Sequence, residues 1–509
     1  MRRPEPDDQS PHDTPAGAPG RAKAVALLAP LLVLMAVAQV YAITDPDYWW
    51  HERTGQVIAE TGSVPRTDPF SFTAAGRAWV NSSWLSDYLL YAVASQFGYA
   101  GNVVVFTAIT LLTALVVYAT CRRRQLGEPA SALLTMVWFA VAKPPANVRT
   151  QMITVLFVAV VAFGLTAYRQ ARRGRLWWFP PLLLVWINLH GGWVMGFALL
   201  ALAILAVLGR RLDGRAAAGA VPLRPLLVAG ALGIAACFLN PWGWRLVLHP
   251  FGYATSSAYG LATIAEWHSP SFDDPRTMLF AGLLLATMAL GLAASPLGAT
   301  EVLWAVVVVL MALRSMRHIP LCAVVLVPLV GARLQAVLPR LRAGVAEVRW
   351  RFILAFVPLI VAGIAVLLAA SKELPANIGA RPSDVGYPAT AVSCIKERNL
   401  QGNIANEYGW GGYLIHALYP GRRVFIDGRD MYGGKLIEEL TGVMGARPGW
   451  QQRLRALDVR VAVVNKDRPL AAAMTESPDW TELCAGPVER LFARSEEGVP
   501  RPGFPGIRR

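Results

Sequence analysis

Charged residues are scarce in this chain, and cysteines are fewer still. Of its 509 residues, 16% are charged, 55% are hydrophobic and five are cysteines. So few cysteines exclude a disulfide-dense scaffold. Cys237 and Cys322 fall in apolar stretches, where a thiol usually acts as a small apolar filler. Cys394 and Cys484 lie near the carboxy terminus, and the sequence leaves open whether they form a disulfide, because it does not show how close their Cα atoms come.

The apolar residues occur in runs of about twenty, the length that a helix needs to cross a bilayer. This pattern predicts a polytopic α-helical membrane protein with about eleven spans. Three of them, 129–142, 176–189 and 300–313, are short enough to be tilted or re-entrant. The predicted spans are 23–43, 99–121, 129–142, 150–168, 176–189, 191–208, 224–239, 276–293, 300–313, 319–337 and 351–370.

Lys and Arg predict the orientation of these spans. They gather in one alternating set of loops, which includes 122–124, 169–175, 210–224 and 333–351. Basic loops stay on the cytoplasmic side, so we expect a multi-pass protein of the cytoplasmic (inner) membrane with its amino terminus inside. The formal net charge of +15 is then a topology signal, and no nucleic-acid partner is expected.

The same pattern divides the chain into parts. Residues 1–22 are predicted to be a disordered cytoplasmic tail, and 23–370 a multi-span transmembrane domain with outer loops 44–98 and 240–275. Residues 371–509 are predicted to form an extracytoplasmic soluble α/β domain. The predicted local elements are a helix at 48–61, a hairpin at 71–80, an interfacial helix at 84–97, strands at 402–406, 423–427 and 459–465, and helices at 411–418, 435–444 and 450–457.

Two acidic residues directly follow the first predicted span. They are Asp45 and Asp47, and the sequence continues with Tyr48, Trp49, Trp50 and His51. Acidic groups beside hydrocarbon are costly, so this pair is a functional candidate. The two tryptophans have a simpler explanation, because aromatic rings gather at the lipid headgroup level in many membrane proteins.

Further polar residues recur at the predicted outer ends of other spans. Taken singly, each is more often a side chain that anchors its helix at the interface. Together they predict one cavity that suits a phosphorylated, lipid-anchored substrate, because arginine binds phosphate in a fork and a carboxylate accepts a proton or holds a divalent metal. These residues are Lys143, Arg149, Asn188, His190, Asn240, Arg245, Glu266, His268, Arg314, Arg317 and His318.

Three outer stretches resemble one known family. Residues 47–62 resemble the first outer loop of the C-type, polyprenol-dependent membrane glycosyltransferases (GT-C), in particular the catalytic subunits of oligosaccharyltransferases. Residues 263–270 are similar to that family's short outer-loop motif, whose Glu contacts the acceptor. Residues 406–429 are similar to the Trp-Trp-Asp-Tyr-Gly segment of its soluble domain and the Arg and Asp that follow. The three stretches occur in the family's order.

The resemblance implies transfer of a sugar or glycan from a polyprenyl phosphate or diphosphate donor to a glycan or protein acceptor on the outer face of the bilayer. Asp47 would act as general base or as a ligand of Mg²⁺ or Mn²⁺, with Asp45 as the alternative. Glu266 would orient the acceptor. The donor phosphate would meet Arg317, Arg314, Arg149 and Lys143. Second-rank or acceptor-side candidates are His190, His268, His51, Tyr408 and Trp410.

Two departures from the family limit this comparison. Glu407-Tyr408-Gly409-Trp410-Gly411 stands in place of the Trp-Trp-Asp-Tyr-Gly motif, so recognition of an acceptor Ser or Thr is not implied. Loop 143–149 has no acid where the family often supplies another carboxylate. Either fewer groups hold a metal here, or the enzyme works without one.

Two other functions stay open. A transporter or flippase of lipid-linked or anionic substrates would favour polar or broken segments at the bilayer midplane, often in two related halves. No clear internal repeat is found, and most spans are apolar at their centres. A membrane scaffold whose outer domain binds a partner would not depend on Asp47.

Overall fold

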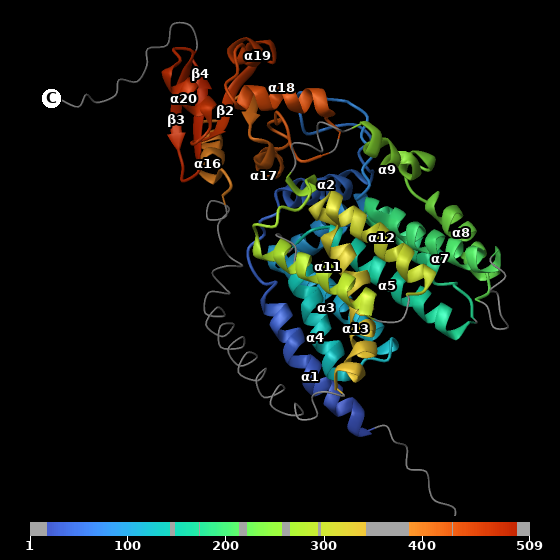
Figure 1. Cartoon of the computed structure of the whole chain (residues 1–509). Helices are drawn as coiled ribbons and strands as arrows, with labels where there is room; N and C mark the ends of the chain where they lie inside the picture. Colours follow the sequence, from blue (N-terminus) through green and yellow to red (C-terminus); the bar gives the residue numbers. More distant parts are fainter. Residues whose placement is uncertain are drawn as a thin grey trace, which may run out of the picture.

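The computed structural model is a helical bundle with a small sheet-containing unit at one end (Figure 1). It describes residues 18–142, 148–172, 174–212, 221–256, 265–293, 297–342, 386–429 and 431–495. Lys143, the predicted span 351–370 and most of the predicted tail 1–22 lie outside these residues.

The helices of the bundle lie close to the predicted apolar runs. Each predicted span within the described residues overlaps one of them, with ends that differ by up to six residues, except that α3 begins 15 residues before the predicted span 99–121. The helices are α1 (Ala18–Val37), α2 (Pro46–Thr61), α3 (Trp84–Arg123), α4 (Glu128–Ala142), α5 (Gln151–Ala171), α6 (Phe179–Leu189), α7 (Val194–Leu212), α8 (Arg224–Cys237), α9 (Trp244–Ser256), α11 (Pro275–Ala293), α12 (Ala299–Arg314) and α13 (Ile319–Arg342). Short 3₁₀ turns are η1 (Gly191–Trp193), η2 (Ala265–Trp267) and η3 (Met316–His318).

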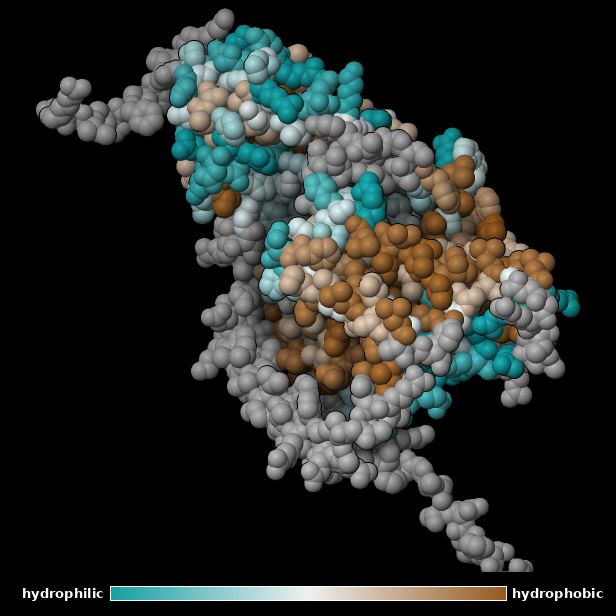
Figure 2. All heavy atoms as spheres, in the orientation of Figure 1, coloured by the Kyte–Doolittle hydropathy of each residue, from teal (hydrophilic) through white to brown (hydrophobic). Residues whose placement is uncertain are grey.

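Five stretches of described helix are long and apolar enough to cross a membrane: Trp84–Arg123, Gln151–Ala171, Gly191–Leu212, Pro275–Leu292 and Met316–Val337. Four shorter apolar helices accompany them. In Figure 2 apolar side chains cover much of the helical part, whereas the sheet-containing unit is mostly hydrophilic. These features support a membrane protein, and the count of eleven spans and the orientation stay predictions.

Helix α3 joins two predicted elements. The predicted interfacial helix 84–97 and the predicted span 99–121 meet at Gly98, whose φ of 65° and ψ of −174° are not helical. Glycine tolerates this positive φ because it has no Cβ. The predicted change from an interfacial helix to a span therefore occurs at a kink inside one helix.

The carboxy-terminal unit is built on four strands: β1 (Asn403–Asn406), β2 (Val459–Asn465), β3 (Trp480–Ala485) and β4 (Glu489–Arg494). The strand order is β1-β2-β4-β3, with β1 parallel to β2 and the other neighbours antiparallel. Around it lie α16 (Ala389–Glu397), η5 (Tyr408–Trp410), α17 (Gly411–Leu418), α18 (Gly434–Met444), α19 (Trp450–Ala456) and α20 (Pro469–Glu476). A disulfide joins Cys394 on α16 to Cys484 on β3, which answers the question that the sequence left open.

Three local expectations were wrong or incomplete. Loop 240–275 contains helix α9, whose apolar residues were not recognised as helical. The predicted hairpin at 71–80 is reduced to a single bridge between Thr67 and Ala78. The predicted strand 423–427 pairs only at Val424, which bridges Ser71 on one side and Ile404 on the other. The first outer loop therefore extends the carboxy-terminal sheet, a long-range pairing that local patterns do not report.

Candidate active site

Asp47 lies in the first turn of α2 and is held by three neighbours. Asp45 caps the helix, and its side chain accepts a hydrogen bond from the Asp47 backbone N–H at 3.0 Å. Pro46 occupies the first helical position, where its missing N–H costs nothing. Trp50 Nε1 donates to Asp47 Oδ1 at 3.0 Å. Gly428, from the carboxy-terminal unit, comes so close that a Cβ there would overlap Asp47 Oδ1.

A chain of ion pairs begins beside Asp47 and joins three other segments. Arg149 Nε lies 3.5 Å from Asp45 Oδ2, and the same guanidinium contacts Glu266 Oε2. Arg317 Nη1 donates to Glu266 Oε1 at 3.0 Å. Four segments that are far apart in the sequence thus meet in one cluster, to which they contribute Asp45, Arg149, Glu266 and Arg317. We call these four residues and Asp47 the outer cluster.

Neighbouring contacts fix the end of this chain of ion pairs that holds Glu266 and Arg317. Ser315 Oγ donates to the Glu266 carbonyl at 2.9 Å, and Gln151 Nε2 donates to the Arg317 carbonyl at 2.7 Å. The Arg317 guanidinium also lies over the Trp267 ring, 4.8 Å from its centroid. The turns η2 and η3 are therefore locked to each other and to α5.

The outer cluster can be reached from outside the protein. The side chains of Arg149, Glu266 and Arg317 keep 17%, 22% and 24% of their surface exposed. These charges are paired with one another, yet their side chains are open enough to exchange partners with an anionic ligand.

Electrostatics distinguish Asp47 from an ordinary aspartate. Burial and the neighbouring carboxylate of Asp45 raise the pKa of Asp47 to about 6, against the opposing charges of Arg149 and His51 and the hydrogen bond from Trp50. A carboxylate with such a pKa is a better proton acceptor near neutral pH than a usual aspartate.

His51 stands one helical turn after Asp47 and is bound to a carboxylate. Its Nδ1 lies 2.6 Å from Asp87 Oδ1, and Asn81 Nδ2 donates to Asp87 Oδ2 at 2.6 Å. Burial alone lowers the pKa of His51, but the charge and hydrogen bond of Asp87 outweigh it and raise that pKa. The Trp50 ring stacks on His51 at 3.6 Å between centroids.

His190 has the opposite electrostatic environment. Its Nδ1 accepts from the Gly192 backbone N–H at 3.0 Å and lies 2.8 Å from Thr154 Oγ1. Burial and the positive charges of Arg317, His51 and Arg149 lower the pKa of His190 to about 3. A neutral imidazole therefore faces the outer cluster, and it supports the Gly191-Gly192 turn.

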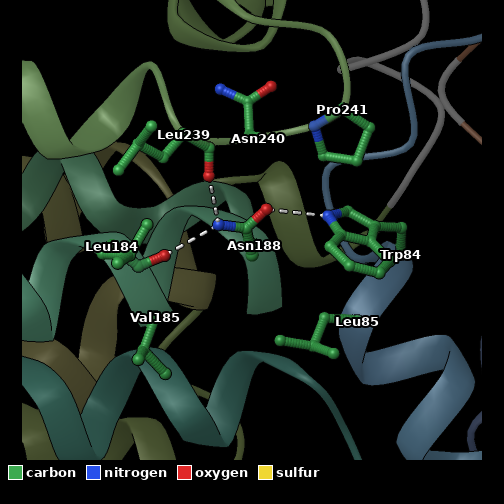
Figure 3. Close-up of a pocket in the computed structure, with 8 residues that line it drawn as sticks. All are labelled: Trp84, Leu85, Leu184, Val185, Asn188, Leu239, Asn240 and Pro241. Carbon is green, nitrogen blue, oxygen red and sulfur yellow. Dashed lines mark hydrogen bonds between the residues drawn. The ribbon is translucent and has the colours of Figure 1, made fainter.

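Other candidate residues lie around the cluster or away from it. Asn188 Oδ1 accepts a hydrogen bond from Trp84 Nε1 at 2.9 Å. Both residues line a pocket together with Leu85, Leu184, Val185, Leu239, Asn240 and Pro241 (Figure 3). Asn240 donates to the carbonyls of Cys237 and Gly243. Asn188 Nδ2 donates to the carbonyls of Leu184 and Leu239, so both amides hold backbone groups.

Three cationic candidates differ from Arg149 and Arg317 in their surroundings. Arg245 is exposed beside Trp244, and Arg314 is exposed at the end of α12, where it forms no ion pair with a described residue. His318 packs near Trp267, with ring centroids 6.2 Å apart.

The remaining acceptor-side candidates are His268, Tyr408 and Trp410. The His268 carbonyl accepts from the Met316 backbone N–H. Trp410 is buried and donates its indole N–H to the Gly386 carbonyl at 3.0 Å, and Tyr408 begins the same 3₁₀ turn.

No group of three or more His, Cys, Asp and Glu side chains that could hold a metal ion occurs among the described residues. Two of the nearby acids, Asp45 and Glu266, are engaged by arginine. We assign no step of the reaction to Mg²⁺ or Mn²⁺, and the role of Asp47 as a ligand of such an ion stays a prediction.

Sequence reasoning missed several contributors to the site. Asp87 and Asn81, which hold His51, were not selected, although an acid in the apolar segment 84–97 was a usable signal. Gly428 lies within a stretch that resembles the family, but no local pattern predicts that it reaches Asp47 on α2.

Comparison with known proteins agrees with this arrangement at the level of fold. The archaeal oligosaccharyltransferase AglB from Archaeoglobus fulgidus, solved with an inhibitory peptide and a dolichol-phosphate, has a TM-score of 0.57 and 11% identity over 94% of this chain and 75% of that one. ArnT from Cupriavidus metallidurans, bound to undecaprenyl phosphate, has a TM-score of 0.54 and 15% identity over 94% and 98% of the two chains.

The arabinofuranosyltransferase AftD from Mycobacteria matches with a TM-score of 0.51 and 14% identity over 93% of this chain and 41% of its own. No protein-family model and no curated protein sequence matches. The chain therefore has a GT-C-like fold, as the resemblance of its outer stretches implied.

Proposed function

We propose that this protein is a membrane glycosyltransferase that moves a sugar or glycan from a polyprenyl phosphate or diphosphate to an acceptor on the extracytoplasmic side. The observation that carries the proposal is the outer cluster, in which a carboxylate of raised pKa stands beside partly exposed arginines. The GT-C-like fold, together with the lipid phosphates bound to AglB and ArnT in their solved structures, supports the donor class.

The proposed reaction uses these residues as follows. A nucleophilic acceptor group attacks the anomeric carbon while the bond from that carbon to the phosphate oxygen breaks. The phosphate leaves with the electron pair, and Asp47 takes the acceptor proton. Glycosyl transfer passes through a sugar that carries positive charge at this carbon, and the leaving group gains negative charge. Arg317 and Arg149 would offset that negative charge, and Glu266 would orient the acceptor.

The disulfide supports the predicted orientation. Disulfides form and persist in oxidising compartments outside the cytoplasm. The bridge between Cys394 and Cys484 fits an extracytoplasmic carboxy-terminal unit, and this unit packs on α2 through α17. This packing supports an extracytoplasmic location for the outer cluster as well.

A transfer assay on the purified full chain in lipid nanodiscs tests the proposal. The probes are radiolabelled sugars linked to undecaprenyl phosphate and diphosphate, offered with peptide and glycan acceptors. We expect transfer by the wild type and none by Asp47→Asn. Movement of the lipid across the bilayer without any transfer would favour a transporter, and an active Asp47→Asn together with an active Asp45→Asn would remove the catalytic assignment.

A further inference from the structure

A buried arginine outside the outer cluster, Arg429, links the first outer loop to the carboxy-terminal unit. The Arg429 side chain is fully buried, with Nη1 2.7 Å from Asp68 Oδ1 and Nη2 2.7 Å from Asp427 Oδ2. Its Nε also donates to Asp427 Oδ1 at 2.7 Å. A buried guanidinium is costly unless it is paired, and here it is shared by two carboxylates.

Aromatic rings enclose the same guanidinium. Its carbon lies 4.8 Å from the Trp79 ring centroid, 5.1 Å from that of Phe70 and 6.0 Å from that of Tyr432. Rings at these distances attract a desolvated cation. We call Asp68, Phe70, Trp79, Asp427, Arg429 and Tyr432 the arginine knot.

The knot joins two segments that are more than three hundred residues apart in the chain. Asp68, Phe70 and Trp79 belong to the first outer loop, and the other members to the carboxy-terminal unit. Backbone bonds reinforce the junction, since Phe72 N–H donates to the Val424 carbonyl at 3.1 Å and Val424 N–H to the Phe70 carbonyl at 3.0 Å. The two segments therefore fold as one piece around Arg429.

The residue between two members of the knot touches Asp47. Gly428 lies between Asp427 and Arg429, and a Cβ at Gly428 would overlap Asp47 Oδ1 and come 3.5 Å from Trp50 Nε1. Trp50 also lies edge-on to Trp79 of the knot, with centroids 6.2 Å apart. The position of the 427–429 backbone thus decides how much room the Asp47 carboxylate has.

We infer that Arg429 is a positioning residue, which presses the Gly428 backbone against Asp47 and so holds that carboxylate in its hydrogen bond with Trp50. Misplacing a reacting group by about 1 Å costs roughly 100-fold in rate. Loss of the knot would release Asp47 without altering the residues that meet the donor phosphate. The inference rests on the proposed function only in taking Asp47 as the base.

The first test needs no substrate. The full chain is labelled with 5-fluorotryptophan in nanodiscs, and the ¹⁹F resonance of Trp50 is assigned with Trp50→Phe. The Asp47→Asn variant then shows where the Trp50 resonance lies when the hydrogen bond from Trp50 to the carboxylate is altered. We expect Gly428→Ala and Arg429→Met to move the Trp50 resonance, because each displaces the 427–429 backbone or the carboxylate.

A matched control lies in the same junction. Arg77 is exposed and donates to the Tyr432 carbonyl at 3.0 Å, but it does not touch residues 427–429. Arg77→Met should leave the Trp50 resonance in place. Where Arg429→Met does not fold, Arg429→Lys replaces it, since lysine keeps the charge but lacks the planar guanidinium that bonds two carboxylates at once. This variant is expected to move the resonance as well. A folded Gly428→Ala with the wild-type resonance overturns the inference, and so does an unmoved resonance in either folded Arg429 variant.

The second test separates positioning from binding. Arg429→Lys is expected to lower kcat about 10- to 100-fold while the affinity for undecaprenyl phosphate stays within about twofold. An equal loss of both would mean that Arg429 only maintains the fold. If the wild type transfers no sugar, the proposed function fails, and the fluorine result still decides whether Arg429 positions Asp47.

Discussion

Two groups of arginine and carboxylate lie at opposite ends of the same helices. The outer cluster includes Arg149, just before α5, and Arg317, just after α12. At the other ends of these helices, Arg169 makes two hydrogen bonds to Glu301, at 3.0 and 3.2 Å, and Arg124 lies 3.8 Å from the same carboxylate. Helix α5 has 21 residues, so the two groups are separated by about 30 Å along its axis.

The two groups differ in their carboxylates, of which the inner group has one and the outer cluster has three. In the inner group, Arg124, Arg169 and Glu301, every charged side chain is paired, and their side chains keep only 12% to 15% of their surface exposed. The outer cluster contains the additional acid Asp47, which receives a hydrogen bond from Trp50 but forms no ion pair among the described residues. Ion pairs between arginine and carboxylate therefore stabilise the packing of the inner group, whereas the outer cluster keeps one carboxylate that can accept a proton.

Changing Asp47 should have the largest effect on activity. Asp47→Asn keeps the size of the side chain and removes the base, so turnover should fall by a factor of about 100 to 10,000. Its thermal midpoint should stay within a few degrees of the wild type. Turnover measured alongside thermal unfolding in nanodiscs checks both, and a fully active variant would mean that the outer cluster is no more catalytic than the inner group.

The pH dependence of transfer should report the same residue. Asp47 accepts a proton only when it is ionised, and its pKa is raised to about 6. We expect kcat/KM to fall about tenfold per pH unit below pH 6 and to be level just above it. An acidic limb near pH 4, where an ordinary aspartate titrates, would contradict the raised pKa.

Arg317→Ala should act on the donor. Removing a partly exposed guanidinium that meets a phosphate is expected to weaken binding of undecaprenyl phosphate about tenfold and acceptor binding much less. Binding constants for the lipid and for an acceptor, measured on the same preparation, decide the matter. Equal losses would indicate that Arg317 anchors the fold, as Arg169 does in the inner group.

Glu301→Gln should affect stability and not catalysis. It leaves Arg124 and Arg169 without their carboxylate, which costs roughly 3 kcal/mol when an ion pair is poorly hydrated. The thermal midpoint should drop by several degrees while turnover of the folded protein stays within about twofold. A large loss of turnover at unchanged stability would break the distinction between the two groups.

The smallest effect is expected for His190→Gln. The pKa of His190 is lowered to about 3, so at working pH this side chain is a neutral imidazole and not the imidazolium that would act as a general acid. Turnover should change no more than about threefold, with the same acidic limb. A new limb in the pH profile of the variant would show that His190 takes part in proton transfer.

Much of the fold could be predicted from the sequence because its signals are local. Apolar runs predicted most helix ends within about six residues, and the periodicity of 48–61 predicted α2. Helix α9 was missed because its apolar residues lie in a segment with prolines and polar residues. The prediction of a strand at 423–427 was wrong because Val424 pairs with segments far away in the sequence, including Ser71.

The site was predictable in part for the same reason. Common sidedness of polar span ends selected Asp45, Arg149, Glu266 and Arg317, which the structure brings together. Sidedness does not reveal which residues touch, so Arg245 was grouped with them although it lies exposed beside Trp244. Arg429 looked like one more charge in a short motif, and only the packing of distant aromatic rings gives it a role.

The most direct test of the account is an experimental structure of the full chain with undecaprenyl phosphate bound in a nanodisc. We predict that the phosphate lies within hydrogen-bonding distance of Arg317 or Arg149, on the side of the outer cluster that holds Asp47. A phosphate bound at Arg124 and Arg169, or at a place remote from both groups, would contradict the assignment of the outer cluster as the active site.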